Sequence, residues 1–237
     1  MRQGKDKKEA RKMKGRHELK HEMTKADCYL LKHKLQHVMS HDPHAGPDGK
    51  YLIRSIYFDN FANKVLTEKK EGYYKRCKFR VRLYNNNFTF LNLEKKSKMN
   101  NLTFKEKCRL TPAEYERIRV GDIDWMQNDE RKLLNELHLH MTLYQLKPVS
   151  IIDYTREVFI KEEGNVRITF DSDVKTSFHN TDLLNEHTPM IDVLDYGTVI
   201  VEVKYDGYLP DVIKKLLQVS DRRSSAFSKY QLGRMFG

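Results

Sequence analysis

Charged side chains recur at every second position in several segments of this 237-residue chain. Basic and apolar residues alternate over residues 78–84, and charged residues recur in the same way over 90–98 and 103–110. Because successive side chains of a β-strand point to opposite faces, each segment would carry one charged face. Lysine and arginine side chains gathered on one face are suited to bind phosphate oxygens, so the pattern predicts anion binding.

Three of these predicted strands share a second feature, a glutamate placed two residues before a lysine. The pairs are Glu18/Lys20, Glu94/Lys96 and Glu202/Lys204. The simplest interpretation is a sheet with one solvated face. A barrel lined in this way would be unstable when empty, because like charges repel and each desolvated ion costs several kcal/mol. A bound polyanion would remove that penalty, and a few carboxylates could then hold a divalent metal ion that bridges phosphates.

The surrounding sequence predicts the elements that must position these charges. Strands are expected over residues 16–23, 51–59, 75–84, 88–98, 103–110, 149–161, 166–173, 189–193 and 198–205. Helices are expected over residues 25–40, 61–72, 129–145 and 210–218, and from Thr111 and Pro112, with a helical or irregular end over 222–237. Consecutive strands joined as hairpins favour an α+β fold on one antiparallel sheet or closed barrel.

Composition limits the class of partner and the compartment. The chain has 44 Lys and Arg against 33 Asp and Glu, a net charge of +11, which implies an anionic partner. Residues 1–14 are predicted to be a basic flexible tail, followed by one domain over 15–237. No apolar run approaches the roughly 18 residues of a transmembrane helix, and no secretory signal is visible. Three cysteines without a CxxC pair fit a reducing cytoplasm, where we expect the protein.

One motif suggests a different chemistry. Residues 17–21 read HELKH, which matches the H-E-x-x-H motif of zinc proteases. The alternating charges predict a strand, on which His17 and His21 face away from Glu18, and no third ligand is apparent. We therefore expect no zinc site here.

Nucleic acid is a second alternative partner. Binding of single strands usually needs aromatic side chains interleaved with the basic ones, so that bases can stack. The aromatic residues here mostly take the opposite parity, as Phe79 does against Arg80 and Arg82. No specific nucleic-acid partner is expected.

Short stretches spread over residues 16–233 resemble one known family. They are RHELKHE (16–22), IRSIYFDN (53–60), KFRVRLYN (78–85), LEKKSK (93–98), FKEKCR (104–109), DYTR (153–156), VRITFD (166–171), VEVK (201–204) and FSKYQLG (227–233). In this order they are similar to the VTC domain, the polyphosphate polymerase branch of the triphosphate tunnel metalloenzymes, also called CYTH-like. The resemblance implies an antiparallel eight-stranded β-tunnel, closed as a barrel, with helices packed outside.

The resemblance also implies an activity and a set of site residues. Polymerase members of the family transfer the γ-phosphoryl group of ATP onto a growing polyphosphate and release ADP, using Mn²⁺ or Mg²⁺. The expected catalytic residues are Lys20, Arg80, Arg82, Lys96 and Arg156. The expected phosphate-binding residues are Arg54, the weakest match, Lys107, Lys204 and Lys229, and the expected metal ligands are Glu202 and Glu18. Phosphoryl transfer needs alignment and charge neutralisation more than a nucleophilic side chain, which fits such a set.

The chain departs from the wider superfamily at one position. The signature there is E-x-E-x-K, and the matching residues here are Arg16, Glu18 and Lys20. Loss of the first glutamate argues against a two-metal hydrolytic site and favours the polymerase. The alternatives are a hydrolase of inorganic or nucleoside triphosphates that uses the same tunnel, and a polyphosphate-binding module without activity. ATP and polyphosphate or triphosphate are the expected partners, and a membrane-protein partner is left open.

Overall fold

The computed structural model describes residues 16–99, 102–177, 180–218 and 228–234. The predicted tail over residues 1–14 lies outside them. Ten antiparallel strands form one sheet: β1 (His17–Thr24), β2 (Ser40–His41), β3 (Lys50–Asp59), β4 (Lys75–Tyr84), β5 (Leu91–Met99), β6 (Leu102–Leu110), β7 (Lys147–Lys161), β8 (Val166–Ser177), β9 (Met190–Asp192) and β10 (Thr198–Tyr205). The predicted strands over 75–84 and 198–205 are confirmed to the residue.

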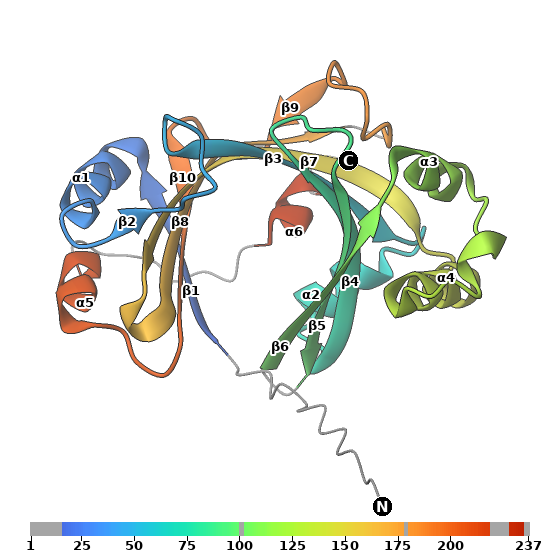
Figure 1. The fold of residues 1–237 in the computed structure, drawn as a ribbon, viewed down its shortest axis with the longest axis horizontal. Helices are drawn as coiled ribbons and strands as arrows, with labels where there is room; N and C mark the ends of the chain where they lie inside the picture. The colour runs from blue at the N-terminus through green and yellow to red at the C-terminus, as the bar shows by residue number, and fades with distance from the viewer. Residues whose placement is uncertain (1–15, 100–101, 178–179, 219–227, 235–237) are drawn as a thin grey trace, which may run out of the picture.

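The main path of the sheet has eight strands in the order β1-β10-β8-β7-β3-β4-β5-β6, with β2 paired to β7 and β9 paired to β8. This path curves into an arch (Figure 1). Its two ends, β1 and β6, share no backbone pairing in the part of the chain that the structure describes. The expected closed barrel is therefore not confirmed, because hydrogen bonds do not close the sheet at this seam, whereas the predicted antiparallel α+β fold is confirmed.

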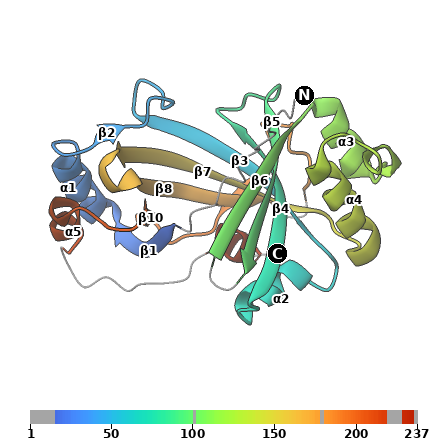
Figure 2. The ribbon, with the colours of Figure 1, turned by 60° about the horizontal axis from the view of Figure 1, so that its bottom comes forward.

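The helices are α1 (Lys25–Leu35), α2 (Lys64–Lys70), α3 (Pro112–Val120), α4 (Lys132–Tyr144), α5 (Asp211–Leu217) and α6 (Lys229–Gly233), with short 3₁₀ turns at η1 (Asp124–Met126) and η2 (Glu163–Asn165). Helices α1 and α5 cover the outer side of the arch at one flank, and α3 and α4 cover it at the other (Figure 1). Helix α6 differs, because it lies inside the arch (Figures 1 and 2). None of the helices in the described ranges is both long and apolar enough to cross a membrane.

Two apolar clusters hold the outer layers together. On β3–β5, buried residues such as Ile56, Val81 and Leu93 belong to the same cluster as α3 and α4 side chains. On β8 and β10, Phe170 and Val201 belong to a second cluster with α1 and α5. Each fully buried aliphatic side chain contributes roughly 1.5–3 kcal/mol to the free energy of folding, so the apolar strand faces pack against the outer helices. The charged strand faces are consequently left on the concave side.

The C-terminal helix is fixed inside the arch by contacts at both of its ends. The Asp59 carboxylate accepts hydrogen bonds from the Val65 and Leu66 amides at 2.8 and 3.2 Å, and the Tyr230 hydroxyl donates to the same carboxylate. At the other end, a Cβ atom on Gly233 would approach the Cδ1 atom of Ile152 to 2.8 Å. Only glycine allows this close approach without a shift of the neighbouring side chain.

Candidate phosphate-binding site

Strand register decides which side chains share the concave face. Residues directly opposite each other across β4, β5 and β6 form three successive rows. The rows are Lys78/Lys96/Lys105, Arg80/Glu94/Lys107 and Arg82/Asn92/Arg109. We call the charged members of the first two rows, together with Arg82, the cationic wall. It contains six basic residues and one carboxylate, that of Glu94.

The opposite flank of the arch has a different composition. Residues of β1, β10, β8 and β7 that face the concave side are basic and acidic in similar numbers. They include Lys20, Glu18, Glu202, Lys204, Arg167, Asp171 and Arg156. We call these seven residues the matched wall, because each basic member has a carboxylate partner.

The ion pairs of the matched wall are short. The Lys20 Nζ atom lies 2.8 Å from the Glu18 carboxylate and 3.4 Å from that of Glu202. The Glu202 carboxylate also lies 2.8 Å from the Lys204 Nζ atom. Burial would raise the pKa of Glu202, but attraction to Lys204 and Lys20 outweighs it and holds that pKa well below its ordinary value. The carboxylate is therefore ionised over the whole physiological range.

Asp171 forms the second centre of the matched wall. Its fully buried carboxylate accepts two hydrogen bonds from Arg156, at 2.6 and 2.7 Å, and a third from Lys229. Burial would raise the pKa of Asp171, yet the two cations lower it to about 2. Asp171 was not among the predicted site residues, although it ends the VRITFD stretch that resembles the family.

On the cationic wall, Glu94 is shared between two cations. Its carboxylate lies 2.6 Å from the Lys105 Nζ atom and accepts a hydrogen bond of 2.7 Å from Arg80. Burial would raise the pKa of Glu94, but Arg80, Arg82 and Lys105 lower it to about 2. The wall thus has one carboxylate of its own among six basic groups.

Neutral hydroxyl groups hold the buried Arg82 guanidinium. It donates to the Ser55 hydroxyl at 3.0 Å and to the Tyr154 hydroxyl at 2.9 Å. In the same way Arg80 donates to the Tyr57 hydroxyl at 3.1 Å. The expectation that aromatic residues point away from the basic face is therefore incomplete, because Tyr57 and Tyr154 lie on it. Both are almost fully buried, so their rings are not free for stacking with bases.

The surroundings of Lys78 on this wall bring its pKa close to neutral pH. Burial lowers its pKa, Tyr57 raises it, and repulsion from Lys96, Arg80 and Lys20 lowers it further, to about 7. Its Nζ atom lies 3.5 Å from the Ser228 hydroxyl, just before α6. Lys78 is on the predicted strand face but was not predicted as a site residue.

The two walls approach each other at the seam between β1 and β6. The Lys96 Nζ atom on β5 lies 3.4 Å from the Glu18 carboxylate on β1. Helix α6 provides a second connection, with Lys229 bound to Asp171 and the preceding Ser228 close to Lys78. The concave face is thus bridged by side chains where the sheet itself remains open.

Most of the predicted site residues lie on this face. Lys20, Lys204, Glu18, Glu202 and Arg156 belong to the matched wall, Arg80, Arg82, Lys96 and the exposed Lys107 belong to the cationic wall, and Lys229 enters from α6. Lys105, which was not predicted, completes the first row and binds Glu94.

Arg54 lies on the other side of the sheet, which corrects its predicted place in the basic lining. It is paired with Leu83 across β3 and β4, whereas the neighbouring Ser55 is paired with Arg82. Its guanidinium binds the Asp153 carboxylate at 2.8–3.0 Å and donates to the Asn185 carbonyl at 2.7 Å. These contacts give it a structural role in the outer layer.

The histidines of the HELKH motif lie on a strand, as predicted. His17 stacks on Tyr205 with ring centroids 4.9 Å apart, and within the described ranges no group of three or more His, Cys, Asp or Glu residues could hold a metal ion. Glu18 and Glu202 share a lysine on this face, both binding the Lys20 ammonium. Two carboxylates suit a Mg²⁺ or Mn²⁺ ion whose other ligands are water and substrate phosphates.

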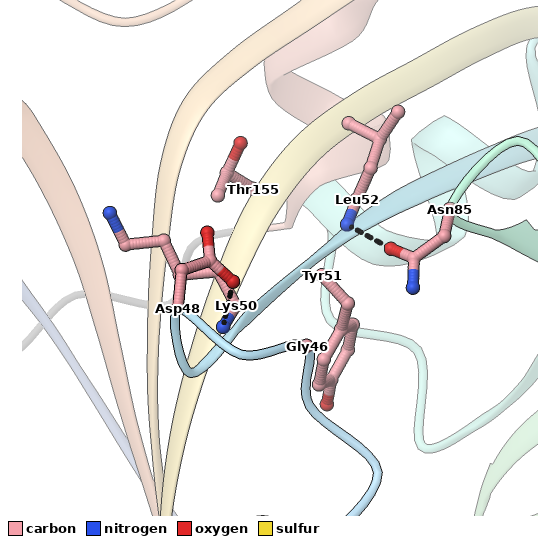
Figure 3. A pocket seen from close by; sticks show the side chains of 7 residues that line it. All are labelled: Gly46, Asp48, Lys50, Tyr51, Leu52, Asn85 and Thr155. Carbon is pink, nitrogen blue, oxygen red and sulfur yellow. Dashed lines mark hydrogen bonds between the residues drawn. The ribbon is translucent and has the colours of Figure 1, made fainter.

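A cavity of about 370 Å³ lies near the start of β3. It is lined by Gly46, Asp48, Lys50, Tyr51, Leu52, Asn85 and Thr155 (Figure 3). Hydrogen bonds within the protein occupy its polar groups: Asp48 accepts from the Lys50 amide and Asn85 from the Leu52 amide. None of the predicted site residues lines it.

Comparison with known proteins gives a family. The family model of the VTC domain matches residues 15–236. The chain belongs to the VTC domain family. A search of curated proteins gives no match.

Solved structures give more distant likenesses to this VTC domain. The PH1819 protein of Pyrococcus horikoshii OT3 has 15% identity and a TM-score of 0.50, over 94% of this chain and 99% of that one. A candidate adenylate cyclase of Bacillus halodurans has 14% identity and a TM-score of 0.47, over 86% and 88% of the two chains. The PH1012 protein of P. horikoshii has 12% identity and a TM-score of 0.41, over 85% of each chain. The likeness to PH1819 extends to the fold alone.

Proposed function

We propose that this VTC domain is a polyphosphate polymerase, which transfers the γ-phosphoryl group of ATP onto a polyphosphate chain held against the concave face. The observation that carries the proposal is the cationic wall, where Lys78, Lys96 and Lys105 lie directly opposite one another on three neighbouring strands. Like charges placed opposite each other destabilise a sheet. A chain of linked phosphates would relieve that repulsion along its whole length.

The side chains of both walls suit the binding of linked phosphates. Arg82 is buried and Arg80 is half-buried. Hydroxyl groups hold both guanidinium groups, Glu94 also binds Arg80, and their rigid planar donors favour geometrically defined contacts with phosphate oxygens. Lysines such as Lys96 and Lys107 add flexible point charges. From the other wall, Lys20, Lys204 and Arg156 face the same space, with Lys229 on α6 next to Asp171.

The reaction forms one bond and breaks one. A terminal oxygen of the polyphosphate attacks the γ-phosphorus of ATP, and the bond from that phosphorus to the bridging oxygen breaks, so that ADP leaves with the electron pair. The attacking oxygen already carries negative charge, so no side chain has to remove a proton. The task of the protein is to align the two anions and neutralise the charge on their oxygens. Lys20, Arg80, Arg82, Lys96 and Arg156 are the proposed catalytic residues.

Glu202 and Glu18 are the proposed ligands of a divalent cation. When bound, Mn²⁺ or Mg²⁺ would neutralise phosphate oxygens that the ammonium and guanidinium groups do not reach. Glu202 is ionised under all physiological conditions, because Lys204 and Lys20 lower its pKa. Lys20 contacts both carboxylates and therefore keeps them on the concave face.

The surroundings of Arg16 favour a polymerase over a two-metal hydrolase. This residue stands where the wider superfamily has its first glutamate. Its side chain is 3.0 Å from the Asp206 carboxylate and donates to the Asn165 carbonyl. Arg16 thus places a cation, already bound by protein oxygens, at the start of β1. The concave face therefore has one possible metal ligand fewer than in the wider superfamily.

Incubation of the protein with ATP and Mn²⁺ tests the proposal, followed by separation of polymer, ADP and orthophosphate on a gel. We expect ADP and long polyphosphate in matching amounts. Orthophosphate without polymer would instead identify a triphosphate hydrolase. ATP that remains intact in the presence of metal would identify a binding module, and either result would overturn the polymerase.

A further inference from the structure

The concave face changes in composition near the turn that joins β4 to β5. Beyond the row of Arg82, Asn92 and Arg109, Tyr84 ends β4 and Phe90 immediately precedes β5. Tyr84 lies two residues after Arg82, and Phe90 lies two residues before Asn92. Because residues two apart along a strand share a face, both aromatic side chains continue the concave face. Aromatic rings thus follow the cations at this end of the arch.

The Phe90 ring is held in place by Arg109. The guanidinium of Arg109 lies 3.8 Å from the centre of the ring and donates a hydrogen bond of 3.0 Å to the Thr89 carbonyl. Phe90 nevertheless remains 42% exposed. A rigidly positioned aromatic ring therefore stays open to a ligand next to a cation of the concave face.

The tyrosines deeper in the arch are covered by protein groups. Tyr57, Tyr154 and Tyr230 are each at most 2% exposed. Tyr57 and Tyr230 stack on each other, with ring centroids 5.2 Å apart. The Lys229 ammonium lies 4.6 Å from the centre of the Tyr154 ring. Phe90 differs from these three tyrosines because its ring is accessible to a flat group from outside.

Two tyrosines belong to the same end of the face as Phe90. Tyr51 lies opposite Arg156 across β3 and β7, and its ring centroid is 5.9 Å from that of Tyr84. The Arg82 guanidinium lies 5.9 Å from the centre of the Tyr84 ring. Tyr51 also lines the 370 Å³ cavity at the start of β3, so open space adjoins these rings. We call Tyr51, Tyr84 and Phe90 the aromatic end.

The spacing between the aromatic end and the cationic wall suits a nucleotide. Two residues along a strand span about 7 Å, so Phe90 is about 7 Å beyond the row of Arg82 and about 14 Å beyond that of Arg80. In ATP, the ribose and the α-phosphate separate the base from the β- and γ-phosphates over a comparable length. A triphosphate bound by Arg80 and Arg82 would therefore bring its base to Phe90.

We propose that the exposed Phe90 ring is a stacking platform for the nucleobase of ATP, at the aromatic end of the concave face. This inference rests on the proposed function, because it assigns a place to the part of ATP that does not react. Stacking uses the flat face of the base and needs no hydrogen bonds to its edges. The platform therefore strengthens the binding of a nucleotide and has no effect on phosphate chains that lack a base.

Parallel binding of ATP and tripolyphosphate tests the platform. Calorimetric titrations of the full chain, done without divalent metal so that no phosphoryl group is transferred, give a dissociation constant for each ligand. Phe90→Leu keeps an apolar side chain next to Arg109 but removes the aromatic face. Phe61→Leu is the matched control, because Phe61 is an exposed phenylalanine that follows β3 at the opposite end from Tyr51.

Phe90→Leu is expected to bind ATP about tenfold more weakly, as the loss of one base–aromatic stack implies, and tripolyphosphate within twofold of the wild type. Phe61→Leu should change neither constant. Unchanged ATP affinity in Phe90→Leu, equal weakening of both ligands, or the same loss in the control would overturn the platform.

Two further results are informative. An oligoadenylate without a triphosphate that binds the wild type as tightly as ATP would identify single-stranded nucleic acid as the ligand of the ring, and would overturn the platform for ATP. If the wild type binds neither ATP nor tripolyphosphate, the cationic wall does not bind phosphates and the proposed function fails as well. That result is distinct from a platform that fails while both ligands still bind.

Discussion

The two walls of the concave face use charge in different ways. On the matched wall, Arg156 and Lys204 each have a carboxylate within 3 Å, so the wall is close to neutral before any ligand arrives. On the cationic wall, Glu94 serves Arg80 and Lys105 together. Lys96 reaches the Glu18 carboxylate across the seam at 3.4 Å, and hydroxyl groups hold Arg82.

This difference separates two tasks of an anion-binding surface. A cation that already has a carboxylate partner gains less from a phosphate, because the phosphate must compete with that partner. A cation held only by hydroxyls, such as Arg82, gains the full charge-assisted hydrogen bond. We infer that the cationic wall provides most of the phosphate affinity. The matched wall provides carboxylates for a cation and keeps its own lysines in place.

The largest effect is expected from Lys96→Ala on the cationic wall. Loss of this ammonium should lower polymerase activity by about 100- to 1,000-fold, because a group that neutralises the transferring phosphoryl disappears. The fold should remain intact, since Lys96 lies opposite Lys78 and Lys105 and its removal relieves repulsion. Steady-state rates and thermal unfolding measure the two effects.

The adjacent Lys95 provides the matched control. It points to the outer side, where its Nζ atom lies 2.6 Å from the Glu136 carboxylate on α4. Lys95→Ala should leave activity near the wild-type level and slightly lower the unfolding temperature. Similar activity losses in the two variants would mean that strand face does not determine function.

A smaller effect is expected from Glu202→Gln on the matched wall. The amide keeps the shape of the side chain but loses a proposed metal ligand, so half-maximal activity should need about 10- to 100-fold more Mn²⁺. Glu157→Gln is the control, because Glu157 is a partly buried carboxylate 2.7 Å from Lys32 on the outer side. Full turnover of Glu202→Gln at the wild-type Mn²⁺ concentration would refute the metal role.

A third prediction concerns pH and Lys78, whose pKa is lowered to about 7 by burial and by neighbouring cations. Bound phosphate favours the ammonium form, so the pKa rises in the complex. Affinity is therefore fully present below pH 7 and falls as the pH rises, by about tenfold between pH 7 and 9. The groups that face Lys78 are Tyr57, Arg80, Lys96 and Lys20, and the Ser228 hydroxyl approaches it from α6.

Lys78→Arg separates this effect from the other titrating groups. Arginine remains charged over the whole range, so most of the fall in affinity should disappear. Tyr57, whose pKa is also about 7, would account for any part that remains. Calorimetric titrations at pH 7.5, in buffers of different ionisation enthalpy, should also show that the wild type takes up protons when it binds the phosphate ligand. An unchanged pH profile in the variant would contradict this assignment.

Strand parity allowed the charged faces to be predicted where one face of a strand is apolar. On β4, alternation of Phe79, Val81 and Leu83 with basic residues identified both faces from the sequence alone. The partners across strands could not be predicted, because register depends on contacts between distant segments. Three features were therefore found only in the structure. Glu94 binds both Arg80 and Lys105, Arg82 donates to the Tyr154 hydroxyl, and α6 lies inside the arch.

Parity gives no clear signal on β3. Residues 51–59 are largely buried on both faces, so the alternation of polar and apolar residues does not reveal which side Arg54 faces. Arg54 was assigned to the lining by resemblance. The sheet places it on the outer layer instead, paired with Asp153.

The smallest effect on activity is therefore expected from Arg54→Met. This change leaves the buried Asp153 carboxylate without its cation and should reduce the free energy of unfolding by about 3 kcal/mol. Phosphate affinity should stay within twofold of the wild type at temperatures where the variant is folded. Arg82→Met is the matched variant, since Arg82 is equally buried but faces the concave side next to Ser55. It should lose phosphate affinity, and a comparable loss in Arg54→Met would place Arg54 back among the phosphate ligands.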